Sequence, residues 1–99
     1  MYNETVNDTK VKEIIKNNMD KFTTDFKWCL EYYIIDNHCN PVAESLRMFL
    51  LNGTLWDESH KNFNQFQDDL KKLKEVVKDE EVIKYIDGFL KRDITALNP

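Results

Sequence analysis

The chain has 99 residues, of which 41% are hydrophobic and 32% are charged, with only two glycines and two prolines. This composition excludes a disordered or collagen-like chain, and no apolar run approaches the roughly 18 residues that a membrane-spanning helix needs. A chain of this size buries about 60 to 70% of the surface that its unfolded form exposes, which supports one modest core. We therefore expect a single domain over residues 1–99, with loose ends at 1–8 and 98–99.

The charge of the chain narrows the choice of partners. Fourteen Lys and Arg residues against eighteen Asp and Glu give a net charge of −4 and a pI near 5.1. Without a basic stripe, such a chain is a poor candidate for nucleic-acid binding, whereas acidic surfaces steer association with basic proteins. The start of the sequence has neither the basic nor the apolar region of a secretory signal. We predict a cytoplasmic protein with neither nucleic acid nor membrane as a partner.

The first predicted helix is the longest, beginning at Asp8 or Thr9 and ending near Asp36. From Ile15 to Tyr33 its apolar residues recur at alternating spacings of four and three, which is typical of one buried helical face. A break at Thr23–Thr24 is the alternative, because Thr24 is a favourable capping residue. The apolar register passes through without a phase change, so the pattern favours one helix.

Residues that favour helix ends predict three further helices. Asn40 and Pro41 start the second, since Asn is a preferred N-cap and Pro suits the first helical position, and it runs to about residue 51 or 52. A third is predicted over 54–77, and Asp79 caps a fourth that ends near Leu90. The connections are short, which favours antiparallel neighbours. The predicted fold is a small all-α bundle of about four helices.

Two of these helices carry a second apolar face. Core packing is favoured for the extra residues, because a four-helix domain covers some helix on two sides. An interface with a partner or a second copy is the alternative, since Trp and Tyr are enriched at binding hot spots. The extra residues are Trp28, Tyr32 and Ile35 on the first helix and Met48, Leu51 and Leu55 across the second helix and its end.

No catalytic or metal-binding signature is evident. Cys29 falls on the apolar seam and is expected to act as a small buried hydrophobe, while a disulfide with Cys39 is disfavoured in a chain without an export signal. His38, Cys39 and the distant His60 lack the paired spacing of a zinc site. We predict no enzyme activity, no cofactor and no metal.

Two classes of function remain. The first is a non-enzymatic inhibitor, such as an immunity protein or antitoxin-like factor that binds and neutralises a basic toxin or enzyme. In size, acidity and Asn/Lys-rich composition the chain is similar to small helical immunity proteins, although no shared motif carries that similarity. The second is a helical structural or regulatory module that self-associates, with a homodimer as its simplest form. The candidate partner-binding residues are Trp28, Tyr32, Asp25, Asp36, Asp57, Glu58, Asp68 and Asp69.

Overall fold

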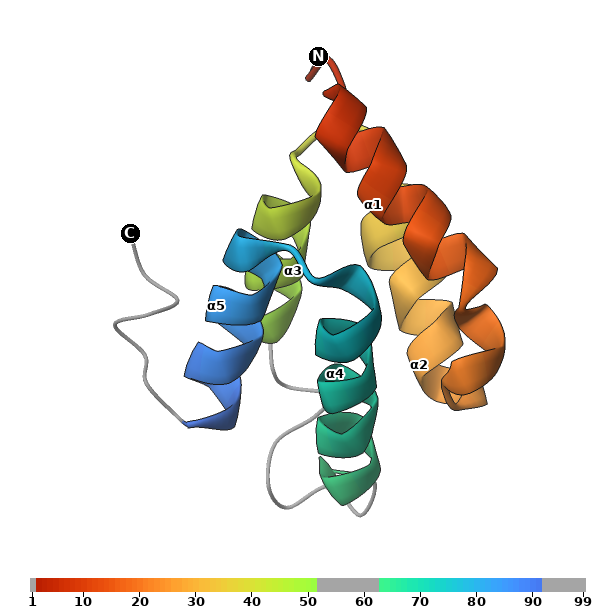
Figure 1. The fold of residues 1–99 in the computed structure, drawn as a ribbon, viewed down its shortest axis with the longest axis vertical. Coiled ribbons are helices and arrows are strands. Elements are labelled where there is room, and N and C mark those ends of the chain that lie inside the picture. The colour runs from red at the N-terminus through yellow and green to blue at the C-terminus, as the bar shows by residue number, and fades with distance from the viewer. Residues whose placement is uncertain (1, 52–62, 92–99) are drawn as a thin grey trace.

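Helices make up the regular secondary structure of residues 2–51 and 63–91, which are the residues that the computed structural model describes (Figure 1). The predicted all-α bundle is therefore confirmed. The α-helices of the described ranges are α1 (Val6–Asn17), α2 (Thr24–Cys29), α3 (Val42–Leu51), α4 (Phe63–Val77) and α5 (Glu80–Leu90). A 3₁₀ turn, η1 (Met19–Lys21), precedes α2, and a π-helix, η2 (Leu30–Ile35), continues it.

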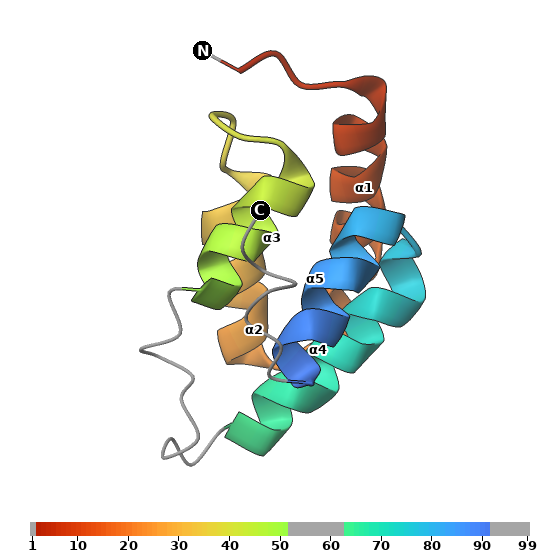
Figure 2. The same cartoon turned by 90° about the vertical axis from the view of Figure 1, so that its left-hand side faces the viewer.

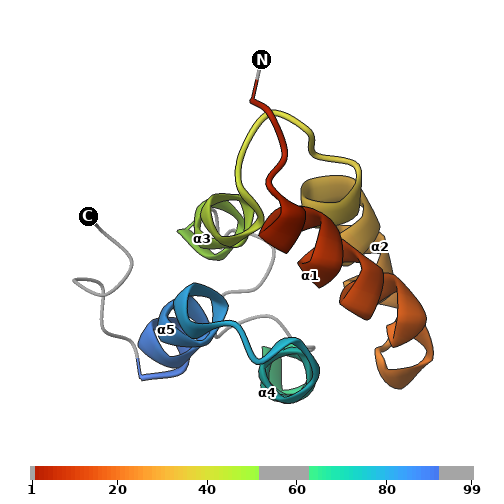
Figure 3. The same cartoon turned by 45° about the horizontal axis from the view of Figure 1, so that its top comes forward.

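Successive helices alternate in direction. In Figures 1 and 2, α1 descends, α2 with η2 returns, α3 descends, α4 rises and α5 descends. Contacts join α3 to α5, α4 to α5, α1 to α4 and α3 to η2. This arrangement confirms the antiparallel prediction. It also places the N-terminal ends of α1, α3 and α5 at one end of the bundle, the end that comes forward in Figure 3.

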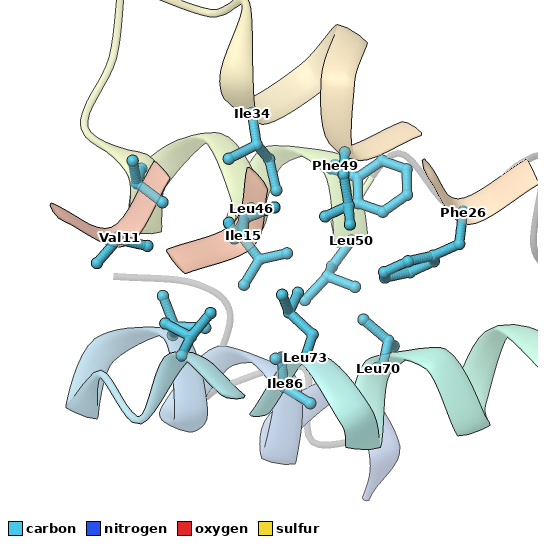
Figure 4. Packing of buried hydrophobic residues seen from close by; sticks show 14 of the residues in the cluster. Val11, Ile15, Phe26, Ile34, Leu46, Phe49, Leu50, Leu70, Leu73 and Ile86 are labelled. Atoms are coloured by element: carbon cyan, nitrogen blue, oxygen red, sulfur yellow. The ribbon is translucent and has the colours of Figure 1, made fainter. Parts of the chain in front are cut away.

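The core is apolar, and its buried residues come from every helical segment except η1, whose Met19 is partly buried against it (Figure 4). Phe66 lies within it, with its ring centroid 5.7 Å from those of Phe26 and Phe49 and 5.6 Å from that of Phe89. These separations fall in the range in which aromatic rings attract one another beyond simple area burial. Helices far apart in the sequence are thus joined through a single ring.

The prediction of one long first helix is wrong. The chain leaves helical geometry at Asn18, forms η1, and is extended at Phe22 and Thr23 before α2 begins. A tertiary contact holds the chain at this break, since the Thr23 hydroxyl donates to Asp69 Oδ2 at 2.6 Å and the Thr23 amide donates to Asp69 Oδ1 at 3.4 Å. Phe22 and Phe26 still reach the core, so the apolar spacing is the same with or without the break.

Asp69 was predicted to contact a partner, but the structure buries it. Asp69 is only 1% exposed. Its side chain extends from α4 to the start of α2, where it meets Thr23. A buried carboxylate needs donors to replace its lost hydration, and Thr23 supplies two of them.

We expect Thr23→Val to lower the free energy of unfolding by about 1.5–3 kcal/mol, the range for a hydrogen bond to a charged group. The substitution keeps the shape of the side chain but leaves Asp69 without its hydroxyl donor. Thr23→Ser keeps the hydroxyl and is the matched control. Urea unfolding followed by circular dichroism measures both, and equal losses in the two variants would contradict the role of this hydrogen bond.

The first helix also begins earlier than predicted, at Val6 rather than after Asp8 or Thr9. Thr5 is the N-cap, and its hydroxyl accepts from the amide of Asp8 at 3.0 Å while the Asp8 carboxylate accepts from the Thr5 amide. This reciprocal pair is a capping box. The sequence contains the pattern of such a box, a threonine followed three residues later by an acidic residue, so this helix start could have been predicted.

The other helix boundaries in the described residues agree with the predicted starts and ends. Helix α3 begins at Val42, next to the predicted Pro41, and ends at Leu51. Asp79 is confirmed as the N-cap of α5, since its side chain accepts from the amides of Glu81 and Val82. The predicted start of the third helix, residues 54–62, lies outside the described residues.

None of the helices in the described ranges has the length and apolar character needed to cross a membrane.

Candidate functional site

Trp28 and Tyr32 lie on the surface of the bundle. Their exposed fractions are 74% and 72%, so the favoured prediction that they pack in the core is wrong. Phe26, Leu30 and Ile34 supply the buried face of α2 and η2 instead. Large aromatic side chains exposed to this degree, four residues apart on one helical face, are the most informative feature of the described surface.

Ile35, the third residue of the predicted face, lies at the end of the π-helix η2 and differs from the other two. At the end of η2 the Asp36 amide donates to the Glu31 carbonyl at 2.8 Å, a bond that spans five residues rather than four. Such wide turns shift the helical register. Ile34 and Ile35 are both buried, whereas Tyr32 is exposed. Ile35 therefore belongs to the core and Tyr32 does not.

The ring of Tyr32 contacts a second aromatic ring, which in turn packs on the core. The Tyr32 ring lies 4.9 Å from that of Tyr33 in an edge-on arrangement, and Tyr33 stacks on Phe49 of α3 at 5.1 Å. These geometries are favourable for aromatic pairs. The exposed ring of Tyr32 thus has one packed neighbour, the ring of Tyr33, which itself packs against the core.

The charged residues that share a helical face with these rings are acidic, while Lys27 directly precedes Trp28 in the sequence. Asp25 precedes Trp28 by one helical turn, and Glu31 and Asp36 are exposed in the same stretch of chain. No Lys or Arg occurs in the sequence from Trp28 to residue 46. We call the exposed set the aromatic face, which consists of Asp25, Trp28, Glu31, Tyr32 and Asp36.

The other predicted contact residues are distributed differently. Asp68 is exposed, but it lies on α4 rather than on the aromatic face. Asp69 is buried against Thr23 and cannot touch a partner in this fold. Asp57 and Glu58 lie outside the described residues. Met48 and Leu51 of the second predicted apolar face are both 43% exposed.

The cysteines and His38 do not form a reactive centre among the described residues. Cys29 is half-buried and packs against the core, Cys39 is exposed, and the two cysteines are not joined by a disulfide. His38 Nδ1 lies 2.8 Å from Glu4 Oε1. Within residues 2–51 and 63–91, no group of three or more His, Cys, Asp or Glu side chains is arranged to hold a metal ion.

A polar network that the sequence interpretation missed ties the N-terminal segment to the bundle. Lys12 is buried and donates through Nζ to Glu4 and to the Asn37 carbonyl. The hydrogen bonds from Lys12 and His38 hold the pKa of the Glu4 carboxyl below its ordinary value. A lysine on the polar side of an amphipathic helix usually points to solvent, so its burial has no local sequence signal.

Comparison with protein-family models, with curated proteins and with solved structures finds no match for this chain. A proposal of function consequently rests on the surface itself.

Proposed function

We propose that the protein is a non-enzymatic, protein-binding inhibitor that neutralises a basic partner by direct contact through the aromatic face. The finer form of the proposal is an immunity protein or antitoxin-like factor acting in the cytoplasm. The observation that supports it best is the exposure of Trp28 and Tyr32 at 74% and 72% on one helical face.

The aromatic face has the composition of a binding hot spot. Trp and Tyr are the residue types most enriched there, because each offers a large apolar area and a polar tip. The ring of Tyr33 beneath Tyr32 restrains the exposed side chain. A partner that covers the face would bury both rings and gain most of its binding free energy from them.

The carboxylates of Asp25, Glu31 and Asp36 favour a partner with Lys or Arg at the matching positions. Arg is the better match, since its guanidinium both stacks on aromatic rings and pairs with carboxylates. Charges at the edge of an interface act mainly on the association rate. Inhibition then follows from occlusion, because a partner residue held on this face is no longer available to its own substrate.

We expect Trp28→Ala or Tyr32→Ala to weaken partner binding about 30-fold each, since truncation of a hot-spot residue removes about 2 kcal/mol. The tagged protein captures its partner from an extract of its source cells, and the partner is then purified and titrated by calorimetry. Val6→Ala is the matched control, because Val6 is an apolar residue that is exposed away from this face. Unchanged affinity in both aromatic variants would contradict the proposal, as would an equal loss in the control.

The inhibitory part of the proposal has its own test. The activity of the purified partner is measured against increasing amounts of the wild-type protein and of the two aromatic variants. We expect one-to-one loss of activity with the wild type and incomplete loss with the variants. Sedimentation of the isolated protein tests the self-associating module: a dimer that Trp28→Ala dissociates would replace the inhibitor proposal with that alternative.

A further inference from the structure

The segment before α1 is held to the bundle chiefly by polar contacts. Residues 2–5, which we call the strap, run beside the loop that leads into α3 (Figure 2). The apolar core of the described residues begins at Val11 and contains no strap residue. The position of the strap therefore depends on hydrogen bonds and ion pairs rather than on the packing of the core.

Glu4 makes the contacts that reach furthest from the strap. Its Oε1 accepts from Lys12 Nζ of α1 and lies 2.8 Å from His38 Nδ1 in the loop after η2. One carboxylate thus joins the strap, the first helix and a loop 34 residues away in the sequence. Hydrogen bonds that involve charged groups are about twice as strong as neutral ones.

Lys12 depends on the strap for its counter-charge. It is only 5% exposed, and its Nζ also donates to the Asn37 carbonyl at 2.9 Å. Within residues 2–51 and 63–91, Glu4 is the only carboxylate at ion-pair distance from Lys12. A buried ammonium group without a counter-charge is strongly unfavourable. The charge of Glu4 therefore makes the burial of Lys12 possible.

A second contact holds the strap nearer to α1. The Tyr2 hydroxyl donates to Asp8 Oδ2 at 2.5 Å, on the carboxylate that also caps the helix. Lys12 and His38 bond directly to Glu4, and Tyr2 is the next titratable group that interacts with it. None of these groups replaces Glu4 as the partner of Lys12.

We propose that the charge of Glu4 controls the strap: the carboxylate holds the strap closed over Lys12, and loss of the charge opens it while the helical bundle stays folded. A neutral Glu4 would leave the ammonium of Lys12 buried without a counter-charge. Opening of the strap gives that ammonium water instead. The bundle keeps its core, because no strap residue belongs to it.

The sign of the pH dependence follows from the same contacts. Hydrogen bonds from Lys12 and His38 hold the pKa of the Glu4 carboxyl below its ordinary value. A carboxyl whose pKa is lower in the closed state stabilises that state at pH values above its ordinary pKa. The stabilisation is lost as the pH falls through the closed-state pKa, so acid opens the strap.

The first test is Glu4→Gln in the full-length ¹⁵N-labelled protein at pH 7. Glutamine keeps the size of the side chain and an acceptor oxygen but carries no charge. We expect the heteronuclear NOE of the Asn3 amide to fall to a value typical of a mobile chain, while those of Ile15 and Leu46 stay unchanged. Glu13→Gln, which removes an exposed carboxylate from α1, is the matched control and should leave all three at wild-type values.

Labelling of lysine amines with an N-hydroxysuccinimide ester, read by mass spectrometry, tests the burial of Lys12. Lys10 and Lys16 are exposed on the same helix and serve as internal references. In the wild type we expect Lys12 to react more slowly than both. Glu4→Gln is expected to raise the rate at Lys12 at least about fivefold, the effect of one lost charge-assisted hydrogen bond on the open population.

Acid titration of the wild type gives a second route to the open strap. We expect the NOE of Asn3 to fall below about pH 4, before the signals of Ile15 and Leu46 change, and Glu4→Gln to lack this step. Wild-type values for both Asn3 and Lys12 in Glu4→Gln would overturn the proposal. Simultaneous loss of the Asn3 and core signals would overturn it too, because the strap and the bundle would then unfold as one unit.

Discussion

Phe66→Ala is expected to lower the free energy of unfolding by about 3–5 kcal/mol, the usual loss for removing a fully buried aromatic ring. Phe66 is 2% exposed, and its ring contacts rings of α2, α3 and α5. No neighbour can move into the space without leaving its own contacts. Since a domain of this size is stable by only about 5–15 kcal/mol, this single change removes much of the total.

Urea unfolding followed by circular dichroism measures the loss, and Phe66→Leu is the control. Leucine fills part of the space, so we expect about half the loss of the alanine variant. Wild-type stability in Phe66→Ala would show that the ring does not join the helices. The two variants also report on function separately: Phe66→Leu folds at neutral pH and should keep its affinity for a partner, because its side chain is not on the aromatic face.

The helical class of the fold could be predicted because its causes are local. Apolar residues recur at the helical period, and the pairs Asn40–Pro41 and Asp79–Glu80 end or begin helices through their own chemistry. The break before α2 could not be predicted in the same way. The residue that holds it is Asp69, which lies 46 residues from Thr23 in the sequence, and the apolar spacing is unchanged by the turn.

The candidate site was only half predictable for a related reason. Spacing on a helix identified Trp28 and Tyr32 as a second face, but spacing does not say whether a face is covered. That depends on which helices lie beside α2 and η2, and these contacts bury Ile35 but not Trp28 or Tyr32. Asp69 was misjudged in the opposite direction. It lies among the polar residues of α4, so the sequence did not indicate that Thr23 would cover it.

Asp8→Ala is expected to lower the free energy of unfolding by about 2–4 kcal/mol at neutral pH, through loss of a helix cap and of hydrogen bonds to a buried carboxylate. Asp8 joins the N-terminal segment, α1 and α3 through Tyr2, Thr5 and Val42. Asn7→Ala is a comparison within the same turn, because its bond to Asp79 is exposed and therefore weaker.

The contribution of Asp8 should also depend on pH. Burial alone would raise the pKa of its carboxyl, but hydrogen bonds from the Tyr2 hydroxyl and from the amides of Val42 and Thr5 outweigh burial and lower the pKa below its ordinary value. A carboxyl whose pKa is lower in the folded state stabilises that state above its unfolded pKa of about 3.9. The stabilisation is then lost as the pH falls through the folded pKa.

Unfolding curves at pH 7 and at several values down to pH 3 test this sign, with wild type compared against Asp8→Asn. We expect the stability gap between them to be largest at neutral pH and to narrow below about pH 4, where protonation removes the charge that the fold binds. Glu13→Gln, an exposed change on the same helix, should alter stability by less than about 0.5 kcal/mol. A gap that stays constant with pH would mean that Asp8 acts through shape and not through its charge.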